Sequence, residues 1–431
     1  MFGFRFADTR EVQPPQSRYH ASRRLILIGL TIVSVLTSAR GEHEALAATH
    51  APPRVDADNA RPGGYGWFEG GHRWQGEFAD PEVVFDNGTY YAYSSGAGGR
   101  YLGIQTSTDA THWTALDHWS NHLAPWQGGP NPRTDGTIPL EIRRSNQNVG
   151  DIYNLNDAIA RPAAWGVTMN YNAWYRRDYW AVGVGHIGDK WYTWAPVKIS
   201  HQLGDGTWDP EGFGRYCLTM AVGRTPIGPF RDVTGAAPYY CDGDPGGSID
   251  PSHFVDPATG NHYLTWKAAG RRSRPGVQGY PSALKVVQLD GNAKMVGPIR
   301  TLLTTAEGSW EGYTVENPSM IRFRNTWYLF YSANSFIPNA QGHSNYATGY
   351  AICSGPMGPC HRVTGSPLMA STARKTGMGG AAAFTDKAGN LRLAAAAFWP
   401  GEYRTYPIHQ PRRMFVVTLT RRNDATLVLA G

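Results

Sequence analysis

Apolar residues along the chain gather in short runs and do not follow the long 3.6-residue period of an amphipathic helix. The runs are rich in β-branched and aromatic residues, and clusters of Gly, Asn, Asp and Pro separate them. Because 51 of the 431 residues are Gly and 30 are Pro, helix-breaking residues recur throughout the sequence. This pattern predicts an all-β protein built from short hairpins.

One hairpin pattern repeats along the chain, and each copy is an apolar strand, a polar turn and a second, aromatic strand. The three clearest copies open at Asp80-Pro81, Asp250-Pro251 and Glu316-Asn317-Pro318. Two weaker copies open at Trp180-Ala181 and Gly379-Gly380. The dipeptide Asn87-Gly88 in the first copy is the strongest hairpin turn signal in the set.

Five such copies predict a five-bladed β-propeller with four strands in each blade. The copies begin about 65 to 70 residues apart except for a longer first interval, which an insertion within residues 120–175 explains. A fainter apolar run after each hairpin, such as residues 102–116, supplies the second strand pair. A β-sandwich is the alternative, but it does not by itself predict five equivalent units.

The acids that open three of the copies are the candidate catalytic residues. The first strand of a propeller blade borders the central channel, so we expect Asp80, Asp250 and Glu316 to meet at the channel mouth. Carboxylates held this close raise each other's pKa. A glycosidase uses such a set, since one carboxyl protonates the leaving oxygen and an ionised one activates water.

These segments resemble the family 43 glycoside hydrolases. The resemblance rests on FADP at Phe78–Pro81, SIDPSHFVD at Ser248–Asp256, and VENP at Val315–Pro318 with WYLFYSAN at Trp327–Asn334, and it runs from about Gly76 to Val417. It implies a five-bladed propeller that inverts the anomeric configuration. It also implies that Asp80 is the general base, Glu316 the general acid, and Asp250 the carboxylate that orients the acid and raises its pKa.

The chain departs from the family pattern at two places. It has Glu-Asn-Pro where Glu-Gly-Pro is common, which keeps the neighbouring Glu311 as an alternative acid. Many relatives have Gly-His at the position of Gly379-Gly380, where the His helps to hold an axial calcium. The resemblance therefore implies no required cofactor and makes an axial calcium doubtful. Ala396 falls in a segment where relatives carry His and an aromatic residue, so we expect a less polar pocket floor.

Aromatic residues near the acids are candidates for stacking on sugar rings. Trp74, Trp180 and Trp310 are nearest to the motifs, and His253 follows Asp250 closely. The alternative to sugar binding, for each of these residues, is a structural role in packing between blades. The sequence contains no spacing typical of a metal site, no phosphate-binding loop followed by a helix, and no Gly-x-Ser-x-Gly elbow.

The four cysteines are Cys217, Cys241, Cys353 and Cys360. An even number in an exported chain predicts two disulfides. Three pairings are open, of which the nearest-neighbour pairing closes two short loops.

The N-terminus has the pattern of an export signal. Arg23-Arg24 precede the apolar run Leu25–Leu36, which is too short to span a bilayer, and Ala45-Leu46-Ala47 offers a cleavage site. We therefore expect a signal peptide over residues 1–47, a linker over 48–75 and the catalytic propeller over 76–431. The expected mature protein is secreted and not stably inserted in a membrane. An uncleaved anchor is the alternative, because the cleavage site lies far from the apolar run.

The net charge of +6 is dispersed, with no run of Lys or Arg, which argues against a nucleic-acid partner. We expect the substrate to be an arabinose- or xylose-containing carbohydrate, cleaved by an α-L-arabinofuranosidase or β-xylosidase activity. The alternatives are an endo-arabinanase of the same mechanism, a non-catalytic carbohydrate-binding propeller, and a retaining, fructan-active propeller enzyme. The sequence does not predict the oligomeric state.

Overall fold

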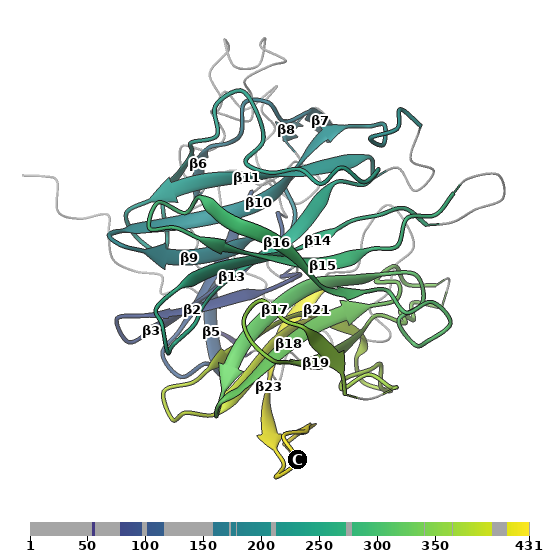
Figure 1. Ribbon diagram of the computed structural model, residues 1–431. Coiled ribbons are helices and arrows are strands. Elements are labelled where there is room, and N and C mark those ends of the chain that lie inside the picture. The colour runs from purple at the N-terminus through teal and green to yellow at the C-terminus, as the bar shows by residue number, and fades with distance from the viewer. Residues whose placement is uncertain are drawn as a thin grey trace, which may run out of the picture. The chain divides into compact units, whose positions relative to one another are not determined.

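The computed structural model describes residues 54–56, 78–96, 101–115, 158–171, 174–177, 179–207, 213–272, 278–339, 341–363, 365–398 and 412–430. Within these ranges the regular elements are all strands, and they belong to one compact unit, Ala51–Gly431. Five antiparallel sheets form the blades, and β7 (Thr168–Tyr171) and β8 (Trp174–Arg177) form a separate hairpin. The predicted all-β, five-bladed propeller is confirmed (Figure 1).

The blades follow one another in chain order. Blade 1 contains β2 (Glu82–Asp86), β3 (Thr89–Ser94), β4 (Gly103–Ser107) and β5 (His112–Ala115), with β1 (Arg54–Asp56) at its outer edge. Blade 2 contains β9 (Gly183–Ile187), β10 (Lys190–Ser200), β11 (Arg215–Gly223) and β12 (Phe230–Asp232), with β6 (Ile159–Arg161) added in parallel. Blade 3 contains β13 (Ser248–Val255), β14 (His262–Ala268), β15 (Ala283–Leu289) and β16 (Met295–Thr304). Blade 4 contains β17 (Val315–Phe323), β18 (Thr326–Ala333), β19 (Ala347–Cys353) and β20 (Cys360–Arg362). Blade 5 contains β21 (Thr376–Thr385), β22 (Leu391–Phe398), β23 (Arg413–Arg421) and β24 (Leu427–Leu429).

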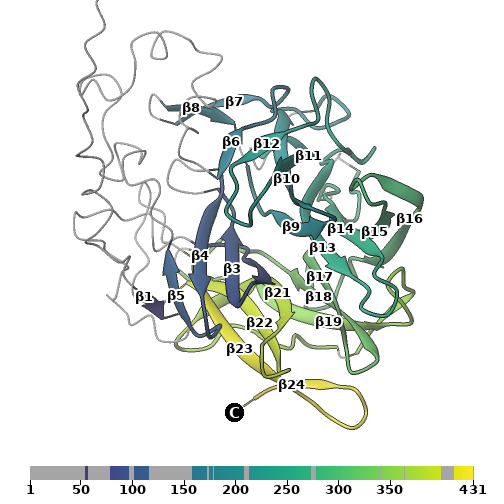
Figure 2. The ribbon, with the colours of Figure 1, turned by 90° about the vertical axis from the view of Figure 1, so that its left-hand side faces the viewer.

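The first strand of every blade lies at the centre of the propeller. Strands β2, β9, β13, β17 and β21 contact one another in that order, and β21 also contacts β2, so the ring closes. Their labels gather in the middle of Figure 1, and Figure 2 shows the later strands of each blade further out. The three acid-bearing motifs therefore reach the centre from three different blades.

Apolar side chains hold each pair of neighbouring blades together. Trp194 of blade 2 packs with Trp266 of blade 3, and Tyr90 of blade 1 packs with Phe384 of blade 5, in two separate buried clusters. The other three interfaces have clusters of the same kind. Each large aromatic ring removes much apolar surface from water, so inter-blade packing explains why the chain is rich in Trp and Tyr.

The innermost strands begin with an irregular backbone. The pairing register shifts between Ile249 and Ser252, between Glu316 and Ser319, and between Gly379 and Ala382. Within the shifts, Asp250, Asn317 and Gly380 have positive φ angles of 54°, 48° and 63°, and Asp80, just before β2, has one of 51°. Asp and Asn tolerate this left-handed conformation better than most residues.

This backbone corrects one detail of the repeat. Asn317, and not Glu316, occupies the position equivalent to Asp80 and Asp250, because each of these three residues has positive φ and directly precedes a proline. Glu316 comes one residue earlier, where it pairs with Ser332 of β18. The three acids thus come from three blades, but they do not occupy three equivalent positions.

The structure confirms two further predictions about the scaffold. The turn at Asn87-Gly88 has two positive φ angles, as a tight hairpin turn requires. The disulfides join Cys217 to Cys241 and Cys353 to Cys360, which is the nearest-neighbour pairing.

The predicted signal peptide, residues 1–47, lies outside the described residues, as do most of the predicted insertion and most of the predicted linker. Of the linker, residues 54–56 pair with β5 as an extra strand. The described part of the chain contains no helix long and apolar enough to cross a membrane.

Blade packing predicts the effect of one small substitution. A Cβ on Gly185 of β9 would come 2.3 Å from Nδ1 of His253 on β13, so Gly185→Ala forces neighbouring blades apart. We expect it to lower the free energy of unfolding by about 1–3 kcal/mol, the usual cost of overpacking. Gly291→Ala, in an open turn with no atom near the added carbon, is the control and should change stability by less than about 0.5 kcal/mol. Equal denaturation midpoints for the two variants would contradict the packing described here.

Candidate active site

Glu316 forms a buried ion pair with Lys267. Its Oε2 lies 2.7 Å from Nζ of Lys267, and their side chains are 13% and 8% exposed. Lys267 lies on β14, paired with Ile249, so blade 3 supplies the cation and blade 4 the carboxylate. Removing either partner would leave an uncompensated charge in a partly dry site.

Asp250 links blades 3 and 4 next to this pair. Its Oδ2 accepts a hydrogen bond from the backbone N–H of Asn317 at 3.1 Å. Burial and the carboxylates of Glu316 and Asp80, opposed by the ammonium of Lys267, together raise the pKa of Asp250 to about 8. At neutral pH the carboxyl cluster therefore holds a proton.

Asp80 is held on two sides. Arg412 donates from Nη1 to Oδ1 at 3.0 Å and from Nη2 to Oδ2 at 3.1 Å, and the hydroxyl of Ser95 donates to Oδ2 at 2.8 Å. A bidentate guanidinium fixes the plane of a carboxylate. Oδ2 accepts two hydrogen bonds, whereas Oδ1 accepts one and keeps a second lone pair to which a water can bind.

Tyr346 lies between the three acids. Its hydroxyl accepts a hydrogen bond from Nδ2 of Asn317 at 2.7 Å. Burial raises the pKa of Tyr346 well above its ordinary value, and the charges of Glu316, Asp80 and Asp250 and a hydrogen bond to Glu316 raise it further. The phenol stays protonated and neutral, which suits a position surrounded by carboxylates.

The two glycines of the fifth blade make room for these residues. A Cβ on Gly380 would come 2.4 Å from Oδ1 of Asp80, and one on Gly379 would come 2.3 Å from the ring of Tyr346. The sequence suggests that this blade leaves the pocket floor less polar. The structure gives a steric reason for both glycines, since a side chain at either position would displace Asp80 or Tyr346.

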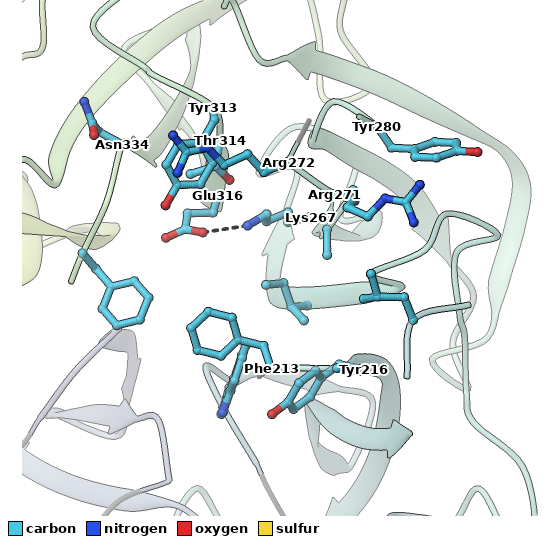
Figure 3. A pocket seen from close by; sticks show the side chains of 18 of the residues that line it. Phe213, Tyr216, Lys267, Arg271, Arg272, Tyr280, Tyr313, Thr314, Glu316 and Asn334 are labelled. Carbon is cyan, nitrogen blue, oxygen red and sulfur yellow. Dashed lines mark hydrogen bonds and ion pairs between the residues drawn. The ribbon is translucent and has the colours of Figure 1, made fainter. Parts of the chain in front are cut away.

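A cavity of about 200 Å³ opens beside Glu316 and Lys267 (Figure 3). Six aromatic residues line it: Trp180, Phe213, Tyr216, Tyr280, Tyr313 and Phe336. The ring of Phe336 also lies 5.2 Å from the guanidinium of Arg412, which holds Asp80. Apolar rings beside a few polar groups are typical of sugar-binding pockets.

Of the predicted sugar contacts, Trp180 lines this cavity, with its ring centroid 4.0 Å from that of Tyr216. Trp310 does not line it and stacks on Tyr331 instead.

His253 does not join the acids. Its ring stacks on that of Trp194, and its Nε2 lies 3.1 Å from Nδ1 of His262. His253 therefore packs between blades, which was the alternative to a sugar contact. Trp74 lies outside the described residues.

Glu311, the alternative acid, is fully engaged elsewhere. It accepts hydrogen bonds from Arg362, from the hydroxyl of Tyr331 at 2.8 Å and from the backbone of Ala306 at 2.9 Å, and it is fully buried. With both oxygens occupied by protein donors, this carboxylate supports blade 4. Glu316, which lines the cavity, is the better candidate for the acid.

The fifth blade lacks the histidine that helps to hold an axial calcium in many relatives. Gly380 supplies no ligand atom at the family's histidine position, and Arg412 already occupies the neighbouring Asp80. Among the residues described, no group of three or more His, Cys, Asp or Glu could hold a metal ion.

Sequence reasoning missed Lys267, Arg412 and Tyr346. One signal was available for Lys267, because it is the lone charge near the end of the apolar strand HYLTWKA. Arg412 and Tyr346 follow no comparable pattern. They reach the acids only through the folding of blades far apart in the sequence.

The raised pKa of Asp250 predicts a pH-dependent stability. The pKa is about 8 in the folded protein against an ordinary value of 3.8, so the folded state binds the proton more tightly. The resulting stabilisation is fully present below about pH 4 and is lost as the pH rises through 8. In urea denaturation, we expect Asp250→Asn to reduce the loss of stability between pH 5 and pH 8.

A residual loss should remain in that variant, because burial also raises the pKa of Glu82 to about 8. Asp290→Asn is the control, since backbone N–H groups of Lys294 and Asn292 lower the pKa of this exposed carboxyl and it stays ionised across the range. An unchanged pH slope in Asp250→Asn would show that Asp250 does not hold the proton.

Comparison with known proteins adds a family to this geometry. The model of the family described as glycosyl hydrolases family 43 matches residues 140–403. No curated protein sequence matches the chain.

Similar solved structures include a thermostable family-43 glycoside hydrolase, with 20% identity, a TM-score of 0.55, and coverage of 82% of this chain and 93% of that one. An endo-1,4-β-xylanase from Bacteroides thetaiotaomicron has 22% identity, a TM-score of 0.54, and coverage of 82% and 94%. An α-L-arabinofuranosidase from Lactobacillus brevis has 13% identity, a TM-score of 0.54, and coverage of 81% and 93%. At these identities the structures support the propeller fold alone. Because the family match spans more than half of the sequence, this chain belongs to the family 43 glycoside hydrolases.

Proposed function

We propose that this enzyme removes arabinofuranosyl or xylosyl units from arabinose- or xylose-containing polysaccharides with inversion at the anomeric carbon. The observation that carries the proposal is the meeting of Glu316, Asp80 and Asp250 around Tyr346, next to an aromatic cavity. The choice of sugars follows the family match, and the similar structures include a xylanase and an arabinofuranosidase.

In the proposed reaction, the proton held by Asp250 moves to the neighbouring Glu316, which donates it to the glycosidic oxygen as the bond from that oxygen to the anomeric carbon breaks. Lys267, 2.7 Å away, stabilises the carboxylate that Glu316 becomes. A water attacks the anomeric carbon from the opposite face of the sugar and gives its proton to Asp80. Arg412 keeps the carboxylate of Asp80 oriented toward that water. Before this step Asp250 holds the proton, and afterwards Asp80 has taken one from water, so the cluster does not carry three negative charges.

A non-catalytic sugar-binding propeller is the competing function, and one observation favours it. Arg412 and Ser95 contact both oxygens of Asp80, whereas a general base needs a free lone pair for water. Against it, Lys267 and Tyr346 stabilise a costly set of acids that sugar binding alone does not need. An endo-arabinanase shares the same chemistry and differs in its products.

We further propose that the enzyme acts outside the cell. The apolar N-terminal run with its preceding arginines and the two disulfides support export. N-terminal sequencing of the protein recovered from the medium would locate any cleavage after Ala47.

The separate roles of the acids predict different responses to the leaving group. In Glu316→Gln, we expect kcat/KM to fall by about 10²–10⁴ on alkyl glycosides and natural oligosaccharides. The loss should be much smaller on 4-nitrophenyl glycosides, because 4-nitrophenolate leaves without a proton. Asp80→Asn should lose about 10²–10⁴ on both kinds of substrate, since activation of water is needed in each case.

Glu307→Gln removes an exposed carboxylate from the same region and is the control for these variants. It should behave as the wild type does. Sugar binding without turnover of any arabinofuranoside or xyloside by the wild type would leave only the binding propeller. Equal losses on alkyl and nitrophenyl substrates in Glu316→Gln would remove Glu316 as the acid.

Inversion predicts the anomer that forms first. When 4-nitrophenyl α-L-arabinofuranoside or β-D-xyloside is hydrolysed inside an NMR tube, the first anomeric signal should belong to the sugar of opposite configuration. The retained anomer would instead indicate a covalent intermediate, as in the fructan-active alternative.

A further inference from the structure

Two adjacent arginines, Arg271 and Arg272, lie on the loop after β14 and both line the cavity next to Glu316. They have different surroundings. Arg271 forms an ion pair with Asp205, donates to the carbonyl oxygen of Gln278 at 2.9 and 3.1 Å, and lies over Tyr280. Its charge is balanced, and its donors are used to hold the loop.

Arg272 is exposed, and it forms no such ion pair with the residues that the structure describes. Its guanidinium instead lies over the ring of Tyr313, 4.5 Å from the ring centroid. Figure 3 shows Arg272 extending toward Tyr313 and Glu316, whereas Arg271 points away from them. A guanidinium stacked on a ring keeps its N–H groups free at its edge.

The charge balance of the cavity makes this arrangement specific. Lys267 is neutralised by Glu316, and Arg271 is neutralised by Asp205. Within the described lining of the cavity, Arg272 therefore leaves one net positive charge at the edge, next to the ring of Tyr313 from the neighbouring blade. A planar fork of donors in a fixed position matches a carboxylate with two parallel hydrogen bonds.

We propose that Arg272 binds the carboxylate of a uronic-acid residue next to the sugar that is cleaved. The preferred substrate is then an acidic polysaccharide, in which arabinose or xylose units lie near hexuronate residues. This inference rests on the proposed glycosidase function and narrows its substrate class. Arg272 is a specificity residue, and the bonds broken and formed are those of the proposed hydrolysis.

The test compares two forms of one polymer, native glucuronoarabinoxylan and the same polymer with its uronic carboxyls reduced to alcohols. Hydrogen bonds to a charged group contribute enough for us to expect about a tenfold higher kcat/KM on the native form for the wild-type enzyme. In Arg272→Gln the ratio of the two rates should fall to about one, and Arg272→Lys, which keeps the charge without the fork, should lie between. Added salt should reduce the wild-type preference.

Arg324→Gln is the matched control. Arg324 also lies over an aromatic ring, that of Phe323 at 5.5 Å, but it sits in the turn between β17 and β18 and does not line the cavity. It should keep the full wild-type ratio. Thermal melting of each variant checks that the fold is retained.

Equal rates of the wild type on the native and reduced polymers would overturn the inference while leaving the proposed hydrolysis intact. So would a preference that survives in Arg272→Gln. If neither polymer is hydrolysed, the proposed function fails, and calorimetric titration with native and reduced oligosaccharides decides the inference. Tighter binding of the uronate form that depends on Arg272 supports it, and equal binding overturns it.

Discussion

Three carboxyl groups from three blades surround one tyrosine, and placing them together costs electrostatic energy. The other polar contacts of the site reduce that cost. Lys267 neutralises Glu316, Arg412 neutralises Asp80, and Asp250 holds a proton because burial and its neighbours raise its pKa. The cluster thus keeps one carboxyl protonated beside ionised ones at neutral pH, which is the condition that acid–base hydrolysis of a glycoside requires.

The backbone brings the acids to this place. Asp80, Asp250 and Asn317 all have left-handed φ angles just before a proline, and for residues other than glycine this conformation costs about 1–3 kcal/mol each. Inter-blade packing supplies the rigidity that keeps such strained residues in place. Gly380, the equivalent residue of the fifth blade, avoids the strain, and the absence of a side chain lets Asp80 lie against it.

The fold could be predicted from the sequence because its signals are local. Each blade begins with a hairpin, whose turn residues, such as Asn87-Gly88, are close together in the sequence. In this chain an acid or a glycine also opens the hairpin motif in four of the blades. The acids could be predicted for the same reason. The sequence could not show that Glu316 lies one residue before the repeat position, because only the left-handed φ angle of Asn317 identifies the equivalent residue.

The surroundings of the acids could not be predicted, because they depend on long-range contacts. Arg412 is 332 residues from Asp80, and Lys267 is 49 residues from Glu316. The choice among aromatic residues fails for a related reason. Trp180 lines the cavity and Trp310 packs on Tyr331, yet both precede a central strand in the sequence, and only the packing of blades separates them.

Infrared spectroscopy of the carboxyl groups tests the central claim most directly. A protonated carboxyl has a carbonyl stretch that an ionised one lacks, so the spectrum of the wild type at pH 7 minus that of Asp250→Asn isolates Asp250, while the contribution of Glu82 cancels. We predict a protonated-carboxyl band in this difference that disappears as the pH rises through about 8. A difference spectrum without that band at pH 7 would show that the three acids do not share the electrostatic environment described here.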